Sequence, residues 1–304
     1  MKKILFSVML LCSSSIGFAQ IFNVTSTEKV NLPEGTATYI STISPQGDYL
    51  LISDQKKQGL QKFDLATGKM QTVTTAAGSS FDAQISQDGK TVVFRETKIG
   101  KDKLKRVGLK SINLTTGETK TLVKPSRNLQ GVAVNQSTVF AVEKGKLMKK
   151  SLSNVKATAE RPVLSIKYGQ LMITRNGKTS ILSPNGQQGA SYLWPSVSPD
   201  GTKILYYLAT KGAYTCDING QNIKFIGSIR APRWYNNDIV VGMNDFDNGA
   251  VVTSSEIIAA TADGKVKQTL TSNDVIAMYP TASAQSNKIA FTTPKGETYI
   301  INVK

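Results

Sequence analysis

The sequence contains no histidine and only two cysteines in 304 residues. The absence of histidine excludes Ser-His-Asp and Cys-His nucleophilic sites, histidine general bases and zinc sites of the HExxH type. Cys12 lies in a segment that we expect to be removed, which leaves Cys216 without a disulfide partner. Cys216 occupies an alternating strand position in AYTCDI, so we expect a small buried side chain and no nucleophile.

The N-terminus has the pattern of a cleaved signal peptide. Two lysines precede an apolar run from Ile4 to Leu11, and Gly17-Phe18-Ala19 places small residues where signal peptidase reads the chain. We predict cleavage after Ala19 and a mature domain of residues 20–304 in the periplasm, with secretion as the alternative. Lipid attachment at Cys12 is a second alternative, although lipobox-type cleavage favours a small preceding residue and this one is a leucine.

Acidic residues are in deficit, with 21 Asp and Glu against 37 Lys and Arg. Removal of the two signal-peptide lysines lowers the formal charge from +16 to +14 (16 − 2). In an exported protein this charge would meet envelope polymers, lipid headgroups or acidic proteins, so we expect no nucleic-acid partner. A solvated, soluble surface is the simpler interpretation of the same charge. No long apolar run follows residue 19, so we expect no transmembrane span.

A ten-residue pattern recurs along the chain: a serine, a polar turn and then a hydrophobic run. The copies are ISPQGDYLLI from Ile43, ISQDGKTVVF from Ile85, VSPDGTKILY from Val197 and, more faintly, ASAQSNKIAF from Ala282. Glycine in the fifth place of the first three permits the positive φ of a tight hairpin. The starts lie 42, 112 and 85 residues apart. With a period of about 40 residues, these intervals predict seven units, or six if the central gap holds two long ones.

A second pattern supports the same period, because a β-prone run precedes another glycine turn in KFDLATGK, SINLTTGE, TCDINGQN and AATADGKV. Each unit therefore reads as four short antiparallel strands. Repetition of such units around an axis predicts an all-β fold, a single β-propeller. Residues 22–32 form a lone strand candidate, and the last unit ends before a fourth strand. We expect the ring to close by pairing of this first strand with the last blade, which removes an open sheet edge.

These hairpins resemble the WD-repeat-like propeller repeat of the TolB-like periplasmic proteins. The resemblance covers most of the mature chain, with only a loose imprint over residues 129–190. It implies the propeller fold and says little of function, because the shared residues form turns. TolB itself carries an additional N-terminal α/β domain that contacts Tol-complex partners, and we expect none here. Prolyl-oligopeptidase-like peptidases share the propeller, but this sequence has no GxSxG elbow.

The topology of a propeller places its long loops on one face, where binding residues concentrate. Tight turns lie on the other face, and the long loops expected here include residues 95–106 and 244–256. Segments that enter the blades on the long-loop face carry aromatic residues beside prolines, which suits binding, although packing between blades is the alternative. We predict a monomeric, non-catalytic binding or scaffolding module, without a cofactor, for an envelope protein, peptide or acidic glycan. The candidate binding residues are Tyr39, Phe81, Asp82, Trp194, Arg233, Trp234 and Tyr279, with Lys101, Lys103, Lys105 and Arg106 steering acidic ligands.

Two other functions stay open. A histidine-free glycan hydrolase or lyase would use Asp82, Asp245 and Asp247 at the central channel, with two carboxyl groups about 5 to 10 Å apart. A sensor or structural propeller without a small ligand would have a narrow or plugged channel. Residues 244–249 vaguely follow a calcium loop, but the glycine has the wrong offset and the final acid is missing, so we expect a polar loop.

Overall fold

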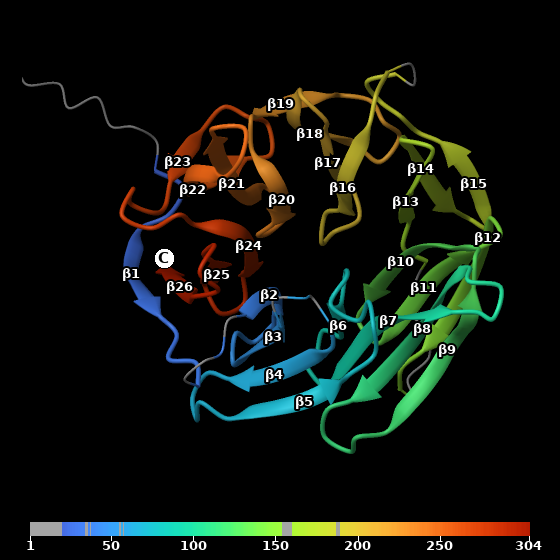
Figure 1. Cartoon of the computed structure of the whole chain (residues 1–304). Helices are drawn as coiled ribbons and strands as arrows, with labels where there is room; N and C mark the ends of the chain where they lie inside the picture. Colours follow the sequence, from blue (N-terminus) through green and yellow to red (C-terminus); the bar gives the residue numbers. More distant parts are fainter. Residues whose placement is uncertain are drawn as a thin grey trace, which may run out of the picture.

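The computed structural model describes residues 20–33, 36, 38–54, 56, 58–153, 160–186 and 189–304, so the predicted signal peptide, residues 1–19, lies outside the described residues. Seven small antiparallel sheets surround a central axis and form a β-propeller (Figure 1). The prediction of an all-β propeller with seven blades is therefore confirmed. No helix long and apolar enough to cross a membrane occurs among the described residues.

Blades 1, 2, 5 and 6 each contain four consecutive strands, ordered from the axis outward. Blade 1 consists of β2 (Thr38–Ile43), β3 (Tyr49–Asp54), β4 (Leu60–Asp64) and β5 (Met70–Thr74). Blade 2 consists of β6 (Gln84–Ile85), β7 (Thr91–Ile99), β8 (Lys105–Asn113) and β9 (Thr119–Ser126). Blade 5 consists of β16 (Tyr192–Val197), β17 (Lys203–Leu208), β18 (Gly212–Asp217) and β19 (Lys224–Gly227). Blade 6 consists of β20 (Arg230–Trp234), β21 (Ile239–Asp247), β22 (Val252–Thr261) and β23 (Lys267–Thr269).

The ring closes as the sequence predicts. Blade 7 consists of β24 (Met278–Ser283), β25 (Lys288–Thr292) and β26 (Thr298–Val303), and its outermost strand is β1 (Val24–Lys29) from the start of the chain. β1 pairs antiparallel with β26 from Val24 opposite Val303 to Lys29 opposite Tyr299. The first and last strands of the chain therefore lie side by side (Figure 1) and share one sheet.

Blades 3 and 4 depart from the four-strand pattern. In the described residues blade 3 contains β10 (Leu129–Asn135), β11 (Thr138–Glu143) and β12 (Lys146–Ser151), and blade 4 contains β13 (Val163–Lys167), β14 (Gln170–Arg175) and β15 (Lys178–Ile181). An odd number of strands leaves the chain on the opposite face of the ring. β13 accordingly runs antiparallel to β16, the inner strand of blade 5. Arg161, just before β13, donates hydrogen bonds to the Val197 and Ser198 carbonyls at the end of β16. The Tyr192 amide at the start of β16 donates to the carbonyl of Gly169, just after β13.

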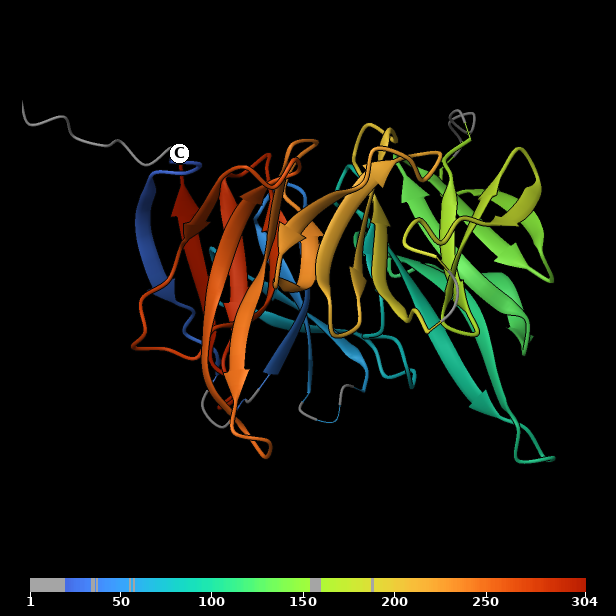
Figure 2. The ribbon, with the colours of Figure 1, turned by 90° about the horizontal axis from the view of Figure 1, so that it is seen from above.

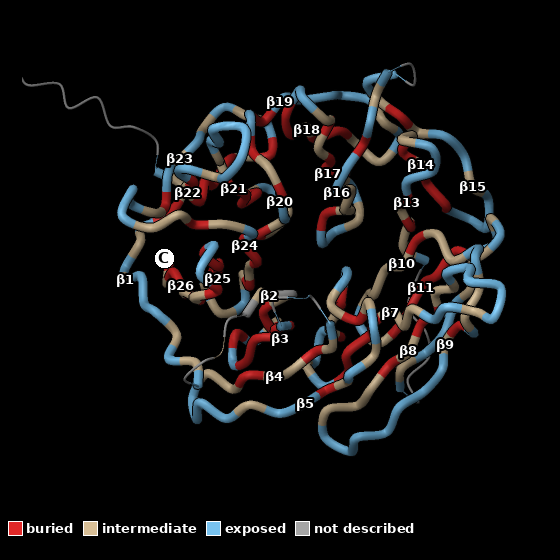
Figure 3. The backbone as a smooth tube through the Cα atoms, in the orientation of Figure 1, coloured by how far each residue is buried: buried red, intermediate tan, exposed pale blue. Residues whose placement is uncertain are grey.

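Hydrophobic side chains fill the spaces between neighbouring blades. The second strand is the most buried strand of blades 1, 2, 3, 4 and 7, and successive residues on it face the two neighbouring blades in turn. In blade 1, Leu51 packs toward blade 2, while Leu50 and Ile52 pack toward blade 7. The buried side chains form seven clusters, one at each junction between consecutive blades, and Figure 3 shows them as buried segments within the ring. The cluster between blades 3 and 4, the two three-stranded blades, is the smallest, with three buried residues.

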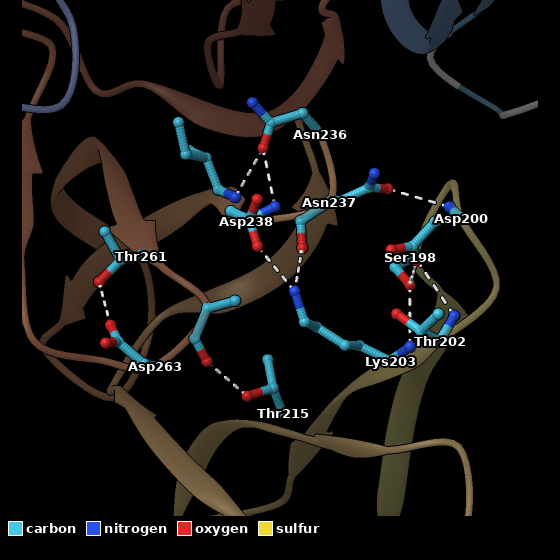
Figure 4. Close-up of polar contacts among 12 residues, drawn as sticks. Ser198, Asp200, Thr202, Lys203, Thr215, Asn236, Asn237, Asp238, Thr261 and Asp263 are labelled. Atoms are coloured by element: carbon cyan, nitrogen blue, oxygen red, sulfur yellow. Dashed lines mark hydrogen bonds and ion pairs between the residues drawn. The ribbon is translucent and has the colours of Figure 1, made fainter.

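The recurring serine organises the first tight turn of its blade. In blade 5 the buried Ser198 hydroxyl accepts a hydrogen bond from the Lys203 amide at 2.9 Å and donates to Asp200 at 2.5 Å (Figure 4). Partial burial alone would raise the pKa of Asp200, but hydrogen bonds from Ser198 and Thr202 lower it below its usual value. Ser86 makes the same pair of contacts, with the Thr91 amide and Asp88. The signature serine and acid therefore close turns.

The same turns also connect neighbouring blades. In Figure 4 the Asp200 amide donates to the Asn237 side chain of blade 6 at 2.9 Å, and the Lys203 ammonium contacts Asp238 at 2.7 Å. Comparable contacts join other neighbours on this side of the ring: Ser283 to the Pro45 carbonyl, Tyr49 to the Gly89 carbonyl, the Gln87 amide to the Gln136 carbonyl, and Tyr235 to Asn287. We call this side of the ring the tight-turn face.

Replacement of the signature serine should destabilise the fold. In Ser198→Ala the Lys203 amide and the Asp200 carboxylate lose their buried partner, so we expect the free energy of unfolding to fall by about 1 to 3 kcal/mol. Urea denaturation followed by circular dichroism measures this change. The matched control is Ser228→Ala at an exposed serine, which should change the free energy by less than about 0.5 kcal/mol. Equal effects of the two substitutions would contradict the role assigned to Ser198.

Candidate binding site

Two long β-hairpins project from the side of the ring opposite the tight-turn face (Figure 2). They are β7–β8, with its turn at residues 100–104, and β21–β22, with its turn at residues 248–251. The prediction that residues 95–106 and 244–256 are long loops is wrong in detail, because most of these residues continue the strands and pair across each hairpin. Their position on one face agrees with the expected topology. We call this side the hairpin face.

The inner strands carry a recurring irregularity where the blades begin on the hairpin face. The pairing register shifts between Leu193 and Ser196 in β16, between Arg230 and Arg233 in β20, and between Met278 and Thr281 in β24. Such bulges alter the direction of side chains and occur next to binding and active sites.

Non-glycine residues occupy the left-handed region at these irregularities. Trp194 has φ +47° and Tyr279 has φ +52°, and Asp82, just before β6, has φ +55°. Each lies four positions before the signature serine of its blade, Ser198, Ser283 or Ser86. A non-glycine residue in this region costs on the order of 1 to 3 kcal/mol, and such strain concentrates at functional sites. Three of the candidate binding residues therefore share one strained backbone position.

Charged side chains near the starts of the inner strands influence one another across the ring. Asp82 in blade 2 lies 4.0 Å from the Arg95 guanidinium of the same blade. The Arg233 charge from blade 6 also acts on Asp82, although blades 7 and 1 lie between them. Asp82 keeps 38% of its side-chain surface exposed, whereas Arg95 keeps only 13%. The Phe81 ring covers Arg95, with its centroid 5.9 Å from the guanidinium carbon. We call Phe81, Asp82, Arg95 and Arg233 the axial cluster.

The electrostatics of the axial cluster are unbalanced. Removal from water raises the pKa of Asp82 above its usual value, although Arg233 and Arg95 act in the opposite direction. Burial lowers the pKa of Arg95, and Asp82 offsets part of this change. The Arg95 Nε–H has no hydrogen-bond acceptor among the described residues. Two arginines with a single distant carboxylate leave positive charge and an unused donor in this cluster.

The predicted aromatic anchors occupy different environments. Trp194 and Tyr279 are partly exposed on the inner strands, and Trp194 packs edge-on against Tyr207 with the ring centroids 5.4 Å apart. Trp234 instead packs against the core cluster between blades 5 and 6 and donates to the Ser196 carbonyl at 3.3 Å. Tyr39 is half-buried on β2. Trp234 therefore packs between two blades, which is the alternative to a binding role that the sequence analysis gives for these aromatic residues.

The predicted basic loop is the exposed tip of the β7–β8 hairpin. Lys101, Lys103 and Lys105 are exposed there. Arg106 does not offer a free cation, because its two terminal nitrogens bind the Asp102 carboxylate at 2.8 and 2.7 Å. This ion pair holds the pKa of Asp102 well below its usual value and fixes the turn. The three lysines remain as the candidates for contact with anions.

The candidate catalytic acids each have a partner of their own. Asp245, with 2% of its side chain exposed, binds Arg230 at 2.6 Å. Asp247 accepts a hydrogen bond from the Gly249 amide at 2.9 Å, so it serves the β21–β22 turn that the sequence compares with a calcium loop. No cluster of three metal-binding side chains occurs in the described part of the chain. Cys216 is buried as predicted, and burial raises the pKa of its thiol to about 12.

Sequence reasoning missed two residues of this face. Arg95 follows the hydrophobic run of β7, and nothing in the pattern places it beneath Phe81. Tyr168 occupies the two-residue turn between β13 and β14, with 92% of its surface exposed. Tyr168 and Gly169 both have positive φ, at +51° and +77°, as in a type I′ hairpin. The reversal of chain direction in blade 4 brings this turn to the hairpin face, and the segment IKYGQL contains the hairpin signal that could have identified it.

The raised pKa of Asp82 gives a stability effect with a defined sign. Because the folded pKa lies above the unfolded value, the folded state binds the proton more tightly, and its contribution to stability is lost as the pH rises through the folded pKa. Asp82→Asn imitates the protonated form at every pH. We therefore expect this variant to gain stability relative to the native protein between about pH 4 and pH 7, as measured by thermal unfolding. A variant that loses relative stability toward pH 7 would show that the contact with Arg95 outweighs desolvation.

No protein-family model and no curated protein matches the chain. Among solved structures, the chain is similar to the RRP9 WD40 repeats, with 8% identity over 93% of this chain and 100% of that chain and a TM-score of 0.63. It is similar to TolB from Acinetobacter baumannii, with 14% identity over 86% of this chain and 55% of that chain and a TM-score of 0.49. An oligogalacturonate lyase in complex with manganese gives 17% identity over 86% and 76% and a TM-score of 0.46. At these identities the comparisons show the fold alone, and the chain shares the β-propeller fold that its resemblance to the TolB-like proteins implies.

Proposed function

We propose that this protein is a non-catalytic binding module of the bacterial periplasm. It holds an envelope protein, peptide or glycan at the centre of the hairpin face, where Asp82, Trp194 and Tyr279 each lie at the start of the inner strand of their blade. The single observation that carries the proposal is the strained backbone shared by Asp82, Trp194 and Tyr279. Strain of this kind persists only where the surrounding structure imposes it. Ala231 of blade 6 has the same strained conformation but is buried in the core, whereas blades 2, 5 and 7 place a partly exposed polar or aromatic side chain there, which a binding role explains.

The charges of the axial cluster favour a ligand with an anionic group. Arg95 has an unused Nε–H, and Arg233 is an exposed second cation. A guanidinium binds a carboxylate or phosphate with two parallel hydrogen bonds, which the 4.0 Å contact with Asp82 does not provide. The aromatic residues nearby would contact the apolar part of the same ligand. A peptide with an acidic side chain and an acidic glycan both have this chemistry.

The arrangement of the acids favours binding over catalysis. A hydrolase or lyase of the predicted type needs two carboxyl groups that face one substrate. Asp245 is buried against Arg230, and Asp247 is bound to the backbone of its own turn. Asp82 therefore stands as the one acid of the predicted set within the axial cluster.

The proposal is tested by affinity capture from an envelope extract with the mature protein as bait. In Trp194→Ala/Tyr279→Ala, we expect capture of the specific partner to fall at least about tenfold, because aromatic anchors dominate binding energy. Phe225→Ala is the matched control, since Phe225 is an exposed aromatic residue on the outer strand β19. Circular dichroism verifies the fold of each variant. A partner retained by the double variant, or a glycan cleaved by the mature protein, would contradict the proposal.

The predicted processing is tested separately. We expect the protein recovered from the periplasmic fraction of an expressing Gram-negative host to begin at Gln20, as read by N-terminal sequencing. Ala19→Arg should block cleavage and leave the precursor bound to the inner membrane, because signal peptidase requires a small residue at this position. A mature protein that begins at Cys12 and carries lipid would support the lipoprotein alternative, and an unprocessed protein in the cytoplasm would contradict export.

A further inference from the structure

Lysines recur at the turns of the hairpin face in six of the seven blades. In each blade one turn on this face connects two neighbouring strands, β13 and β14 in blade 4 and the second and third strands in the other blades. The lysines lie in or directly beside these turns, and among them only the turn of blade 6, residues 248–251, has no lysine. All of these lysines are exposed. The members are Lys56 in blade 1, Lys101 and Lys103 in blade 2, Lys144 in blade 3, Lys167 in blade 4, Lys211 in blade 5 and Lys295 in blade 7. We call this set the lysine ring.

Four members of the lysine ring carry charge without an acidic partner, whereas Lys167 lies over the Tyr168 ring and Lys295 acts on Glu297. Among the described residues, no acidic side chain lies within ion-pair distance of Lys101, Lys103, Lys144 or Lys211. On the tight-turn face three lysines pair with acids of the turns: Lys203 with Asp238, Lys265 with Asp263 and Lys120 with Glu118. Among the described residues other exposed lysines of those turns, such as Lys69 and Lys178, also lack an acid within ion-pair distance. The hairpin face is therefore distinguished by the arrangement of its lysines around the ring and not by an excess of charge.

Apolar side chains project from the same face. Ile99 and Leu104 are exposed at the tip of β7–β8, and Phe246 and Val251 are exposed at the tip of β21–β22. Both hairpins extend beyond the rest of the face (Figure 2), so these side chains would meet a flat surface first. Tyr168, directly beside Lys167, is a further exposed aromatic residue of this face. Two exposed apolar side chains on each projecting hairpin are thus in a position to contact a partner surface.

We propose that the hairpin face docks on an anionic lipid bilayer. The lysine ring supplies attraction to acidic headgroups, and the hairpin tips insert their apolar side chains into the interface between headgroups and acyl chains. The internal ion pair of Asp102 with Arg106 keeps the β7–β8 tip ordered without adding net charge. Because these contacts are distributed around the ring, they would orient the propeller axis perpendicular to the membrane, with the axial cluster facing the lipid.

The pattern distinguishes a bilayer from the other anionic partners. A soluble acidic polymer requires cations but gains nothing from exposed isoleucine and phenylalanine at the two tips. An acidic protein would require a contiguous complementary patch, whereas the apolar tips here belong to blades 2 and 6. A bilayer is planar and laterally fluid, so its headgroups adjust to cations and apolar tips at separated positions on one face. The combination of a flat cationic ring and protruding apolar tips therefore fits lipid.

This inference does not rest on the proposed function, because lipid vesicles contain no protein or glycan partner. The two are separable by variant: Trp194→Ala/Tyr279→Ala should keep vesicle binding, and Ile99→Ser/Phe246→Ser, described below, should keep capture of the protein partner from the envelope extract. If both hold, the propeller presents its binding site at the membrane surface.

The charge requirement is tested by cosedimentation of the mature protein with vesicles of phosphatidylcholine alone or with about one third phosphatidylglycerol. We expect binding to the anionic vesicles at least about tenfold tighter than to the neutral ones, with a steep loss at high salt. Lys101→Glu/Lys103→Glu/Lys105→Glu should reduce this binding at least about tenfold. The matched control is Lys69→Glu/Lys178→Glu/Lys224→Glu, which makes the same change of net charge at exposed lysines outside the hairpin face and should reduce binding much less.

The apolar requirement is tested with Ile99→Ser/Phe246→Ser. This variant should lose the part of the binding that persists at high salt, because that part depends on insertion. Ile223→Ser/Phe225→Ser is the control, since these residues are also exposed, at 49% for Phe225 against 59% for Phe246, but lie at and beside β19.

Three results would overturn the proposal. The first is absence of binding to anionic vesicles. The second is an equal loss in both lysine variants, which would indicate attraction by net charge alone. The third is unchanged binding of Ile99→Ser/Phe246→Ser together with full competition by soluble polyglutamate, which would identify the face as a site for acidic polymers or proteins.

Discussion

Burial of both faces of the second strand of each blade is the constraint on which this structure depends. Leu50 and Leu51 point to opposite sides of β3 and are both fully buried, so blade 1 is incomplete unless a sheet packs on each side of it. The same requirement passes from blade to blade and is met only when the ring closes. Seven clusters at seven junctions meet it, and the pairing of β1 with β26 completes the sheet at the point of closure. In the absence of a disulfide, these clusters and the tight turns hold the ring together.

The turns on the two faces of the ring are consequently constrained to different degrees. On the tight-turn face, Ser198, Asp200 and Lys203 close their own turn and also bind blade 6, so a change there affects both packing and register. The turns of the hairpin face carry fewer such contacts, and their length and composition vary from two residues at Tyr168 and Gly169 to the long hairpins of blades 2 and 6. The strained residues Asp82, Trp194 and Tyr279, the lysine ring and the exposed apolar hairpin tips all lie on this side.

The sequence predicted what depends on local turn chemistry and hydrophobic runs. Serine and glycine at fixed spacing identified blades 1, 2 and 5, and the absence of a fourth strand from the last unit predicted the closure by β1. It did not predict the three-stranded blades, because a missing strand leaves no positive signal. Nor did it predict the contact of Arg95 with Phe81 or the influence of Arg233 on Asp82, which arise only when separate blades meet around the axis. Trp194 and Trp234 looked alike in sequence, and only packing separates them.

Blades 3 and 4, each with three strands among the described residues, also decide which residues reach the hairpin face. Blade 3 leaves the chain on the tight-turn face, so β13 begins beside the end of β16, and the turn at Tyr168 falls on the hairpin face. A second odd blade then restores the original direction before β16. With only one odd blade, the turns that carry Lys211 and Lys295 and the hairpin that carries Phe246 would project from the opposite face. The shortened blades must therefore occur as a pair, and this pairing keeps the cations and apolar tips of blades 1, 2, 5, 6 and 7 on one surface.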